Sequence, residues 1–152
     1  MKKILFSLCM ALLVLGTSGC KKDVHMHTSY YTVQAYNPNP SYNYEGWLSD
    51  DKLGYLYASF ENEDITPDLI ENGCVLAYFI DSDGRDNPLP YEVFYQYDNS
   101  YSYYSDTFTY DVESVAGKTG IITFKFQTSD LENTTSIAKW GNVSFKVCVL
   151  EN

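Results

Sequence analysis

The residues best suited to bind a metal ion form a short aspartate-rich loop in the middle of the chain. Asp81 and Asp83 match the first and third ligand positions of a calcium loop, Asp86 adds another carboxylate, and Glu92 falls at the twelfth position. Arg85 stands at the fifth position, where calcium loops carry an oxygen ligand, and Asp-Gly turns commonly join strands without any ion. We therefore keep calcium as an alternative and expect no other cofactor.

Tyrosine offers a second kind of chemistry. The chain has 15 tyrosines, concentrated between residues 91 and 110. Alternate side chains of a strand share a face, so Tyr91, Val93, Tyr95 and Tyr97 predict an almost continuous aromatic row. Such rings either cover a half-wet sheet or stack against sugars or a protein partner. The predicted platform consists of Tyr91, Tyr95, Tyr97, Tyr101, Tyr103 and Tyr104, of which we expect several rings to be partly exposed.

Catalytic side chains are harder to find. The only histidines, His25 and His27, lie near the N-terminus in a polar segment, whereas a Ser or Cys nucleophile needs an imidazole held beside it. Two of the 20 acidic residues could form a carboxylate pair of the kind that glycosidases use, so this remains an alternative. No acid stands in an apolar stretch where burial would raise its pKa, so we expect no catalytic residue and treat a small carbohydrate-active enzyme as the alternative.

The N-terminus predicts a lipoprotein signal peptide over residues 1–19. Lys2 and Lys3 form the basic region, residues 4–15 are apolar, and small residues precede Cys20. The apolar run is shorter than a transmembrane helix requires. We expect Cys20 to be acylated, residues 20–29 to form a tether, and residues 30–152 to form the folded domain.

Signal removal leaves 133 residues, with 8 basic against 20 acidic side chains, a net charge of −12. A surface of that sign repels nucleic acid and anionic lipid. Attachment to the bilayer is therefore expected through acyl chains on Cys20. A glycan or a protein remains an alternative as a further partner.

Two cysteines remain after Cys9 leaves with the signal peptide and Cys20 takes lipid. Cys74 and Cys148 lie in separate predicted strands, in a compartment that permits disulfides. Cys148 alternates with the inward residues of its strand and is expected to face outward. We expect both thiols to be free, with a disulfide as the alternative if the two strands are neighbours.

Alternating apolar side chains predict strands over residues 55–60, 119–127 and 143–150. The apolar run 74–80 predicts a central strand covered on both faces. A short turn before it is expected to be capped by Thr66 and ended by a left-handed Gly73. Together these segments predict an all-β chain: an antiparallel β-sandwich of seven to eight short strands, Ig-like or jelly-roll-like.

Residues 130–141 are weakly helical because Asn133-Thr134-Thr135 has poor helix propensity. The sequence therefore predicts that Trp140 lies in a loop covering one end of the core.

Six stretches form a wider pattern: Trp47, the strand ending in Phe60, Ile65-Thr66, Gly73-Cys74-Val75-Leu76-Ala77-Tyr78, Leu89-Pro90-Tyr91 and Phe145-Lys146-Val147-Cys148-Val149-Leu150. They resemble small β-sandwich lipoproteins of Gram-negative gut anaerobes, a family of unknown function. The similarity runs from about Trp47 to the end of the chain. It implies a compact sandwich on the outer membrane, facing the periplasm or the surface, and carries over no catalytic residue. The expected function is a non-catalytic binding or structural module.

Overall fold

The computed structural model describes residues 24–39, 45–49, 52, 54–97 and 102–151. The predicted signal peptide, Cys20 and Tyr101 lie outside the described residues. Within them the chain forms nine strands and two helices. In order these are β1 (His25–Val33), β2 (Leu48–Ser49), β3 (Leu56–Asn62), α2 (Pro67–Asn72), β4 (Cys74–Ile80), β5 (Asp86–Pro88), β6 (Tyr91–Gln96), β7 (Tyr103–Glu113), β8 (Gly120–Thr128), α3 (Asn133–Trp140) and β9 (Val143–Glu151).

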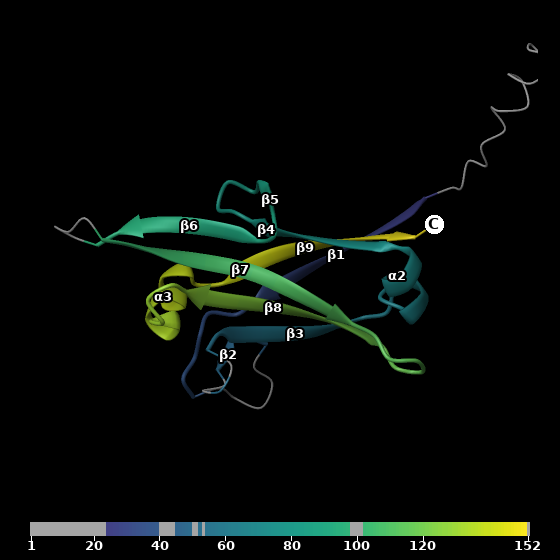
Figure 1. Ribbon diagram of the computed structural model, residues 1–152, viewed down its shortest axis with the longest axis horizontal. Coiled ribbons are helices and arrows are strands. Elements are labelled where there is room, and N and C mark those ends of the chain that lie inside the picture. Colours follow the sequence, from purple (N-terminus) through teal and green to yellow (C-terminus); the bar gives the residue numbers. More distant parts are fainter. Residues whose placement is uncertain (1–23, 40–44, 50–51, 53, 98–101, 152) are drawn as a thin grey trace, which may run out of the picture.

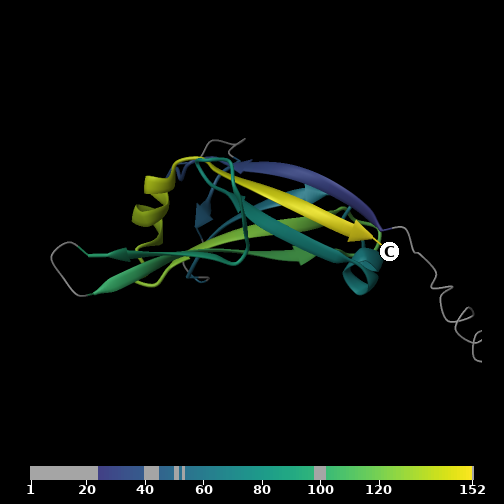
Figure 2. The same cartoon turned by 90° about the horizontal axis from the view of Figure 1, so that it is seen from above.

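The strands form two antiparallel sheets that pack face to face (Figure 1). One sheet has the order β1-β9-β4-β5 and the other the order β2-β3-β8-β7-β6. The predicted all-β antiparallel sandwich is confirmed. Helix α2 lies at one end of the sandwich, and α3 lies at the other end beside the β6–β7 hairpin (Figure 2).

Large aromatic side chains fill the space between the sheets. Phe124 of β8 and Phe145 of β9 stack with ring centroids 4.0 Å apart and so join the two layers. Trp47 packs against Phe108, Phe126 and Phe145. These rings are all buried, and the alternation along β8 and β9 predicts this for Phe124, Phe126 and Phe145.

Strand β1 begins earlier than the predicted domain boundary. His25 pairs with Glu151, and the ladder continues without a break to Val33 opposite Val143. The predicted tether 20–29 is therefore wrong over its second half, and the folded domain starts before residue 30. Strand β1 forms through backbone pairing with β9. The side chains of its first five residues are mostly exposed, so this part of the strand needs no alternating apolar pattern in the sequence.

The expectation for β4 is also corrected. Ala77 and Phe79 are buried on its inner face, but Cys74 and Leu76 are exposed on the other. No described element covers that outer face, so the continuous apolar run belongs to a strand buried on one side only.

Helix α2 begins as predicted and ends differently. The Thr66 hydroxyl accepts a hydrogen bond from the Leu69 amide at 3.1 Å, and Pro67 takes the first position. Gly73 has φ −111°, which is extended and not left-handed. Glycine is needed there for space, because a Cβ would lie 2.6 Å from the carbonyl oxygen of Leu150.

Candidate functional site

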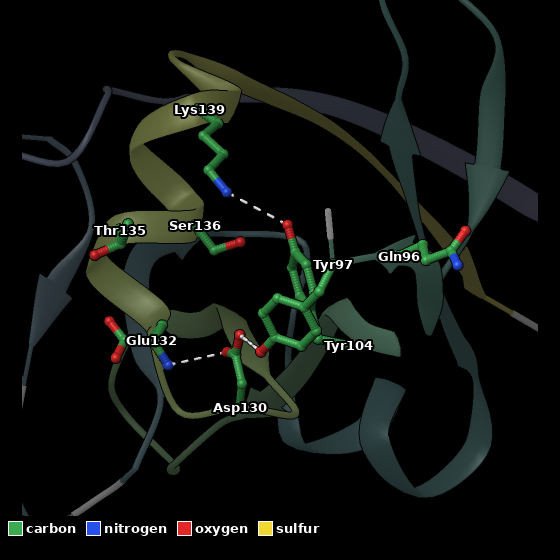
Figure 3. A pocket seen from close by; sticks show the side chains of 8 residues that line it. All are labelled: Gln96, Tyr97, Tyr104, Asp130, Glu132, Thr135, Ser136 and Lys139. Atoms are coloured by element: carbon green, nitrogen blue, oxygen red, sulfur yellow. Dashed lines mark hydrogen bonds between the residues drawn. The ribbon is translucent and has the colours of Figure 1, made fainter. Parts of the chain in front are cut away.

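A pocket of about 460 Å³ lies between α3 and the β6–β7 hairpin. Helix α3 forms one side, and the hairpin and the turn before the helix form the others (Figure 3). The lining side chains are Gln96, Tyr97, Tyr104, Asp130, Glu132, Thr135, Ser136 and Lys139. They come from segments about 35 residues apart, which tertiary folding alone brings together.

Two tyrosines, Tyr97 and Tyr104, line the pocket, and Tyr95 packs against Tyr104 beside it. Tyr95 and Tyr104 are opposite each other in the β6–β7 ladder and stack with ring centroids 5.2 Å apart. Tyr97 lies 4.9 Å from the Tyr104 ring and keeps 41% of its surface exposed. Burial raises the pKa of Tyr95, and the Asp106 carboxylate raises it further. The three rings are thus held against one another, with Tyr97 open to solvent.

Asp130 supplies a fixed negative charge at the base of these rings. The Tyr97 hydroxyl donates to Asp130 Oδ2 at 2.6 Å, the Thr128 hydroxyl donates to Oδ1, and the Glu132 amide donates to Oδ1 at 3.1 Å. The bonds from Thr128 and Tyr97 lower the pKa of Asp130, while the bond to Asp130 raises the pKa of Tyr97 to about 12. Asp130 is therefore an acceptor at neutral pH.

Helix α3 is held by a buried carboxylate. Ser136 Oγ donates to Asp106 Oδ1 at 2.7 Å and Trp140 Nε1 donates to Oδ2 at 2.8 Å. Ile137 is fully buried on the same helix. These contacts override the poor intrinsic propensity of residues 133–135, so the prediction that Trp140 lies in a loop is wrong. Trp140 ends the helix with its ring partly buried and packed against the core.

Lys139 brings a cation to the opposite side of the pocket. Its amine lies 3.3 Å from the Tyr104 hydroxyl and 5.6 Å from the centroid of that ring. Figure 3 shows its side chain reaching from α3 toward the tyrosines. The pocket therefore offers aromatic faces, anionic acceptors and one cationic donor within a single concave surface.

Comparison with protein families, curated proteins and solved structures finds no match. The chemistry of the pocket is thus the main guide to its ligand. No helix within the described residues is long and apolar enough to cross a membrane.

The predicted tyrosine platform is only partly assembled. Tyr95, Tyr97 and Tyr104 gather in the pocket region, whereas Tyr91 stacks on the core ring of Phe79 at 5.0 Å. Tyr103 is 63% exposed, but it lies on the other face of the hairpin. The alternation of a strand imposes this split, because Tyr103 and Tyr104 are adjacent and must point to opposite faces.

The aspartates of the predicted calcium loop are engaged separately. Asp81 Oδ1 accepts the amides of Asp83 and Arg85 at 3.0 and 2.9 Å, and the Arg85 bond is the main reason that the pKa of Asp81 is lowered. The Asp83 carboxylate pairs with Arg85 at 3.2 Å, and Asp86 pairs with Lys146 of β9. Among the described residues no three acidic, histidine or cysteine side chains gather as a metal site.

Cys74 and Cys148 are both free thiols on neighbouring strands. In the β4–β9 ladder Cys74 is opposite Leu150 and Cys148 is opposite Leu76, so the cysteines are diagonal neighbours on one face. Cys148 faces outward, as its alternation predicts, on the same face as the exposed Leu76, but its side chain is nevertheless buried. It lies between flanking strands, with Leu76 opposite it in β4 and the Thr28 hydroxyl of β1 3.8 Å from its sulfur.

Proposed function

We propose that this protein is a lipid-anchored binding protein of the bacterial envelope, whose pocket between α3 and the β6–β7 hairpin binds carbohydrate without chemical change. It is anchored to the outer membrane through acylated Cys20, and it faces the periplasm or the cell surface. The observation that carries the proposal is the combination, in one pocket, of two tyrosine rings, which contact each other, with hydrogen-bonding groups of both charges.

Sugars present two surfaces that such a pocket matches. Their C–H faces pack on aromatic rings, and the exposed Tyr97 ring supplies such a face. Their hydroxyls both donate and accept, so Asp130 and Glu132 can accept from them while Lys139 donates. A purely apolar ligand would leave these charged groups desolvated and unpaired.

The position of the pocket supports anchored presentation. Strand β1 begins at the end of the sandwich that holds α2 and the end of β9. Cys20 precedes His25 by five residues, which span at most about 18 Å. Helix α3, which lines the pocket, lies at the opposite end of the sandwich (Figure 2), so a domain held by Cys20 presents the pocket away from the bilayer.

Binding is tested on a printed glycan array with wild type, Tyr104→Ala and Tyr103→Ala. The two tyrosines are chain neighbours on opposite faces of the hairpin, so Tyr103→Ala is a matched control. We expect Tyr104→Ala to lose most of the array signal and Tyr103→Ala to keep it. No carbohydrate signal from folded wild type, or equal loss in both variants, contradicts the proposal.

The anchor is tested by detergent phase partitioning of the protein expressed with its own leader. We expect wild type to enter the detergent phase and Cys20→Ala to stay in the aqueous phase, because acyl chains supply the membrane affinity. If both proteins remain aqueous, the lipid anchor is refuted.

A small carbohydrate-active enzyme is the second candidate, favoured by one observation: Asp130 and Glu132 line the same pocket. A general acid must hold a proton near neutral pH, and the lowered pKa of Asp130 disfavours that role. Release of reducing sugar from array-positive glycans, abolished by Glu132→Gln, would establish hydrolysis in place of simple binding.

A further inference from the structure

A second pocket of about 510 Å³ lies on the other side of Lys139. Its walls include the rings of Phe79, Tyr91 and Trp140, and its polar groups include Asp81 and Ser82 from the loop after β4. The Phe79 and Tyr91 rings stack, and Trp140 meets Phe79 edge-on at 5.5 Å, so the three rings pack together as one aromatic wall. It has the same mixture of ring faces and hydrogen-bonding groups as the first pocket.

We refer to the two pockets, which share a lining residue, as the trough. Lys139 lines both of them. Strand β6 and the residue after it contribute to both as well, with Tyr91 and Val93 in the second pocket and Tyr97 in the first. The six residue steps from Tyr91 to Tyr97 span about 20 Å along a strand. A single sugar ring fills only part of that length.

The charges of the trough discriminate between acidic and uncharged polysaccharides. Asp81 and Asp130 have lowered pKa values and are anionic at neutral pH. Glu132 adds a third carboxyl, against the single cation Lys139. An acidic polysaccharide would therefore be repelled at both ends, whereas an uncharged one meets acceptors for its hydroxyls.

We propose that the pocket of Tyr91 and Trp140 is a second sugar subsite, and that the trough takes an uncharged oligosaccharide spanning Lys139. This inference rests on the proposed function and specifies its substrate class. One unit lies against Tyr97 and Tyr104, and another lies against Tyr91 and Trp140. Lys139 donates to a hydroxyl between them.

The test uses the folded domain on an array of uncharged gluco-, manno-, galacto-, xylo- and chito-oligosaccharides, each printed from the monosaccharide to the hexasaccharide, with oligouronates as the acidic comparison. We expect apparent affinity to rise about tenfold or more with length, since one or two additional stacked rings are engaged. Val93→Tyr should narrow the second pocket and remove this gain while leaving the binding of the shortest ligands unchanged.

Phe94→Ala is the matched control, because Phe94 is the next residue of β6 and is 68% exposed on the opposite face. Ser82→Trp, in the exposed loop after β4, blocks the same pocket without altering a strand and serves if Val93→Tyr does not fold. Equal affinity for monosaccharide and hexasaccharide, a length gain retained in folded variants of the second pocket, or preference for oligouronates overturns the inference while sugar binding stands. Failure to retain any carbohydrate overturns the proposed function as well.

Discussion

The two ends of the sandwich are closed in different ways. At the α2 end the backbone packs tightly: a Cβ on Gly120 would lie 2.1 Å from the carbonyl oxygen of Ile65, and one on Gly73 would meet Leu69. At the α3 end, side-chain hydrogen bonds from Ser136 and Trp140 to Asp106 attach the helix to β7, and pockets remain beside the helix. Close backbone contact leaves no room for a ligand, whereas a helix held by polar side chains leaves a trough lined with functional groups.

The largest effect is expected from removing the carboxylate that holds α3. Asp106→Ala leaves the Ser136 hydroxyl and the Trp140 indole N–H without an acceptor inside the protein. Each buried group without a partner costs about 1 to 3 kcal/mol, so we expect unfolding free energy to fall by about 4 kcal/mol. Urea denaturation measures the loss, and Asp111→Ala on the same strand, with an exposed carboxylate, is the control. An unchanged midpoint would mean that α3 is held by its apolar contacts alone.

The second largest effect is expected from a substitution at the tightly packed α2 end of the sandwich. Gly120→Ala forces a methyl group into the Ile65 backbone, which cannot yield as a flexible side chain would. We expect a loss of about 3 kcal/mol in unfolding free energy with no change in ligand affinity of the folded protein. Thr119→Ala, at the exposed neighbouring position, should have little effect. If Gly120→Ala also weakened binding, the two ends would not be independent.

The sequence predicts the packed core better than the trough. Alternation along β8 and β9 identifies the inward side chains because the period of a strand is local. The partners of Tyr97 could not be found this way, since Asp130 follows it by 33 residues and no local pattern links them. Helix α3 was missed because its stability comes from Asp106, outside the window in which propensity is read.

The outer face of the sheet containing β4 shows a second limit of prediction from sequence. An apolar run is typical of a strand covered on both sides, yet Leu76 is 39% exposed. Burial of Cys148 likewise depends on its cross-strand neighbours, which its own strand does not reveal. Sequence gives the periodicity of a strand, while the coverage of each face depends on the completed sheet.

Titration of Tyr97 and Asp130 tests the hydrogen bond between them at the α3 end of the sandwich. The Asp130 bond raises the pKa of Tyr97 from 10.0 to about 12. A group whose folded pKa is raised favours the fold below its unfolded pKa, so this contribution is present up to about pH 10 and is lost as pH rises toward 12. The Asp130 pKa is lowered, so its contribution is present above about pH 4 and is lost at lower pH.

Asp130→Asn should bring the Tyr97 pKa back toward 10 and reduce both the acid and the alkaline loss of stability. Ring-labelled tyrosine NMR follows the phenol directly, and Tyr103 on the opposite face serves as the internal reference. An unaltered Tyr97 titration in Asp130→Asn would show that the 2.6 Å bond does not control this phenol.

The smallest effect concerns the turn that places Asp130 and Glu132. Leu131 between them has φ 65°, a left-handed conformation that costs a side-chain-bearing residue about 1 to 2 kcal/mol. Its side chain is 71% exposed, so replacing it removes little packing. Leu131→Gly relieves the strain and gives back about 0.5 to 1 kcal/mol through greater freedom of the unfolded chain, so we expect a net gain of about 0.5 kcal/mol in unfolding free energy. Thermal unfolding measures it, with Leu131→Ala, which keeps a Cβ, as the control. If glycine gained no stability over alanine, the backbone at 131 would be unstrained, and the turn would position its carboxylates without storing energy.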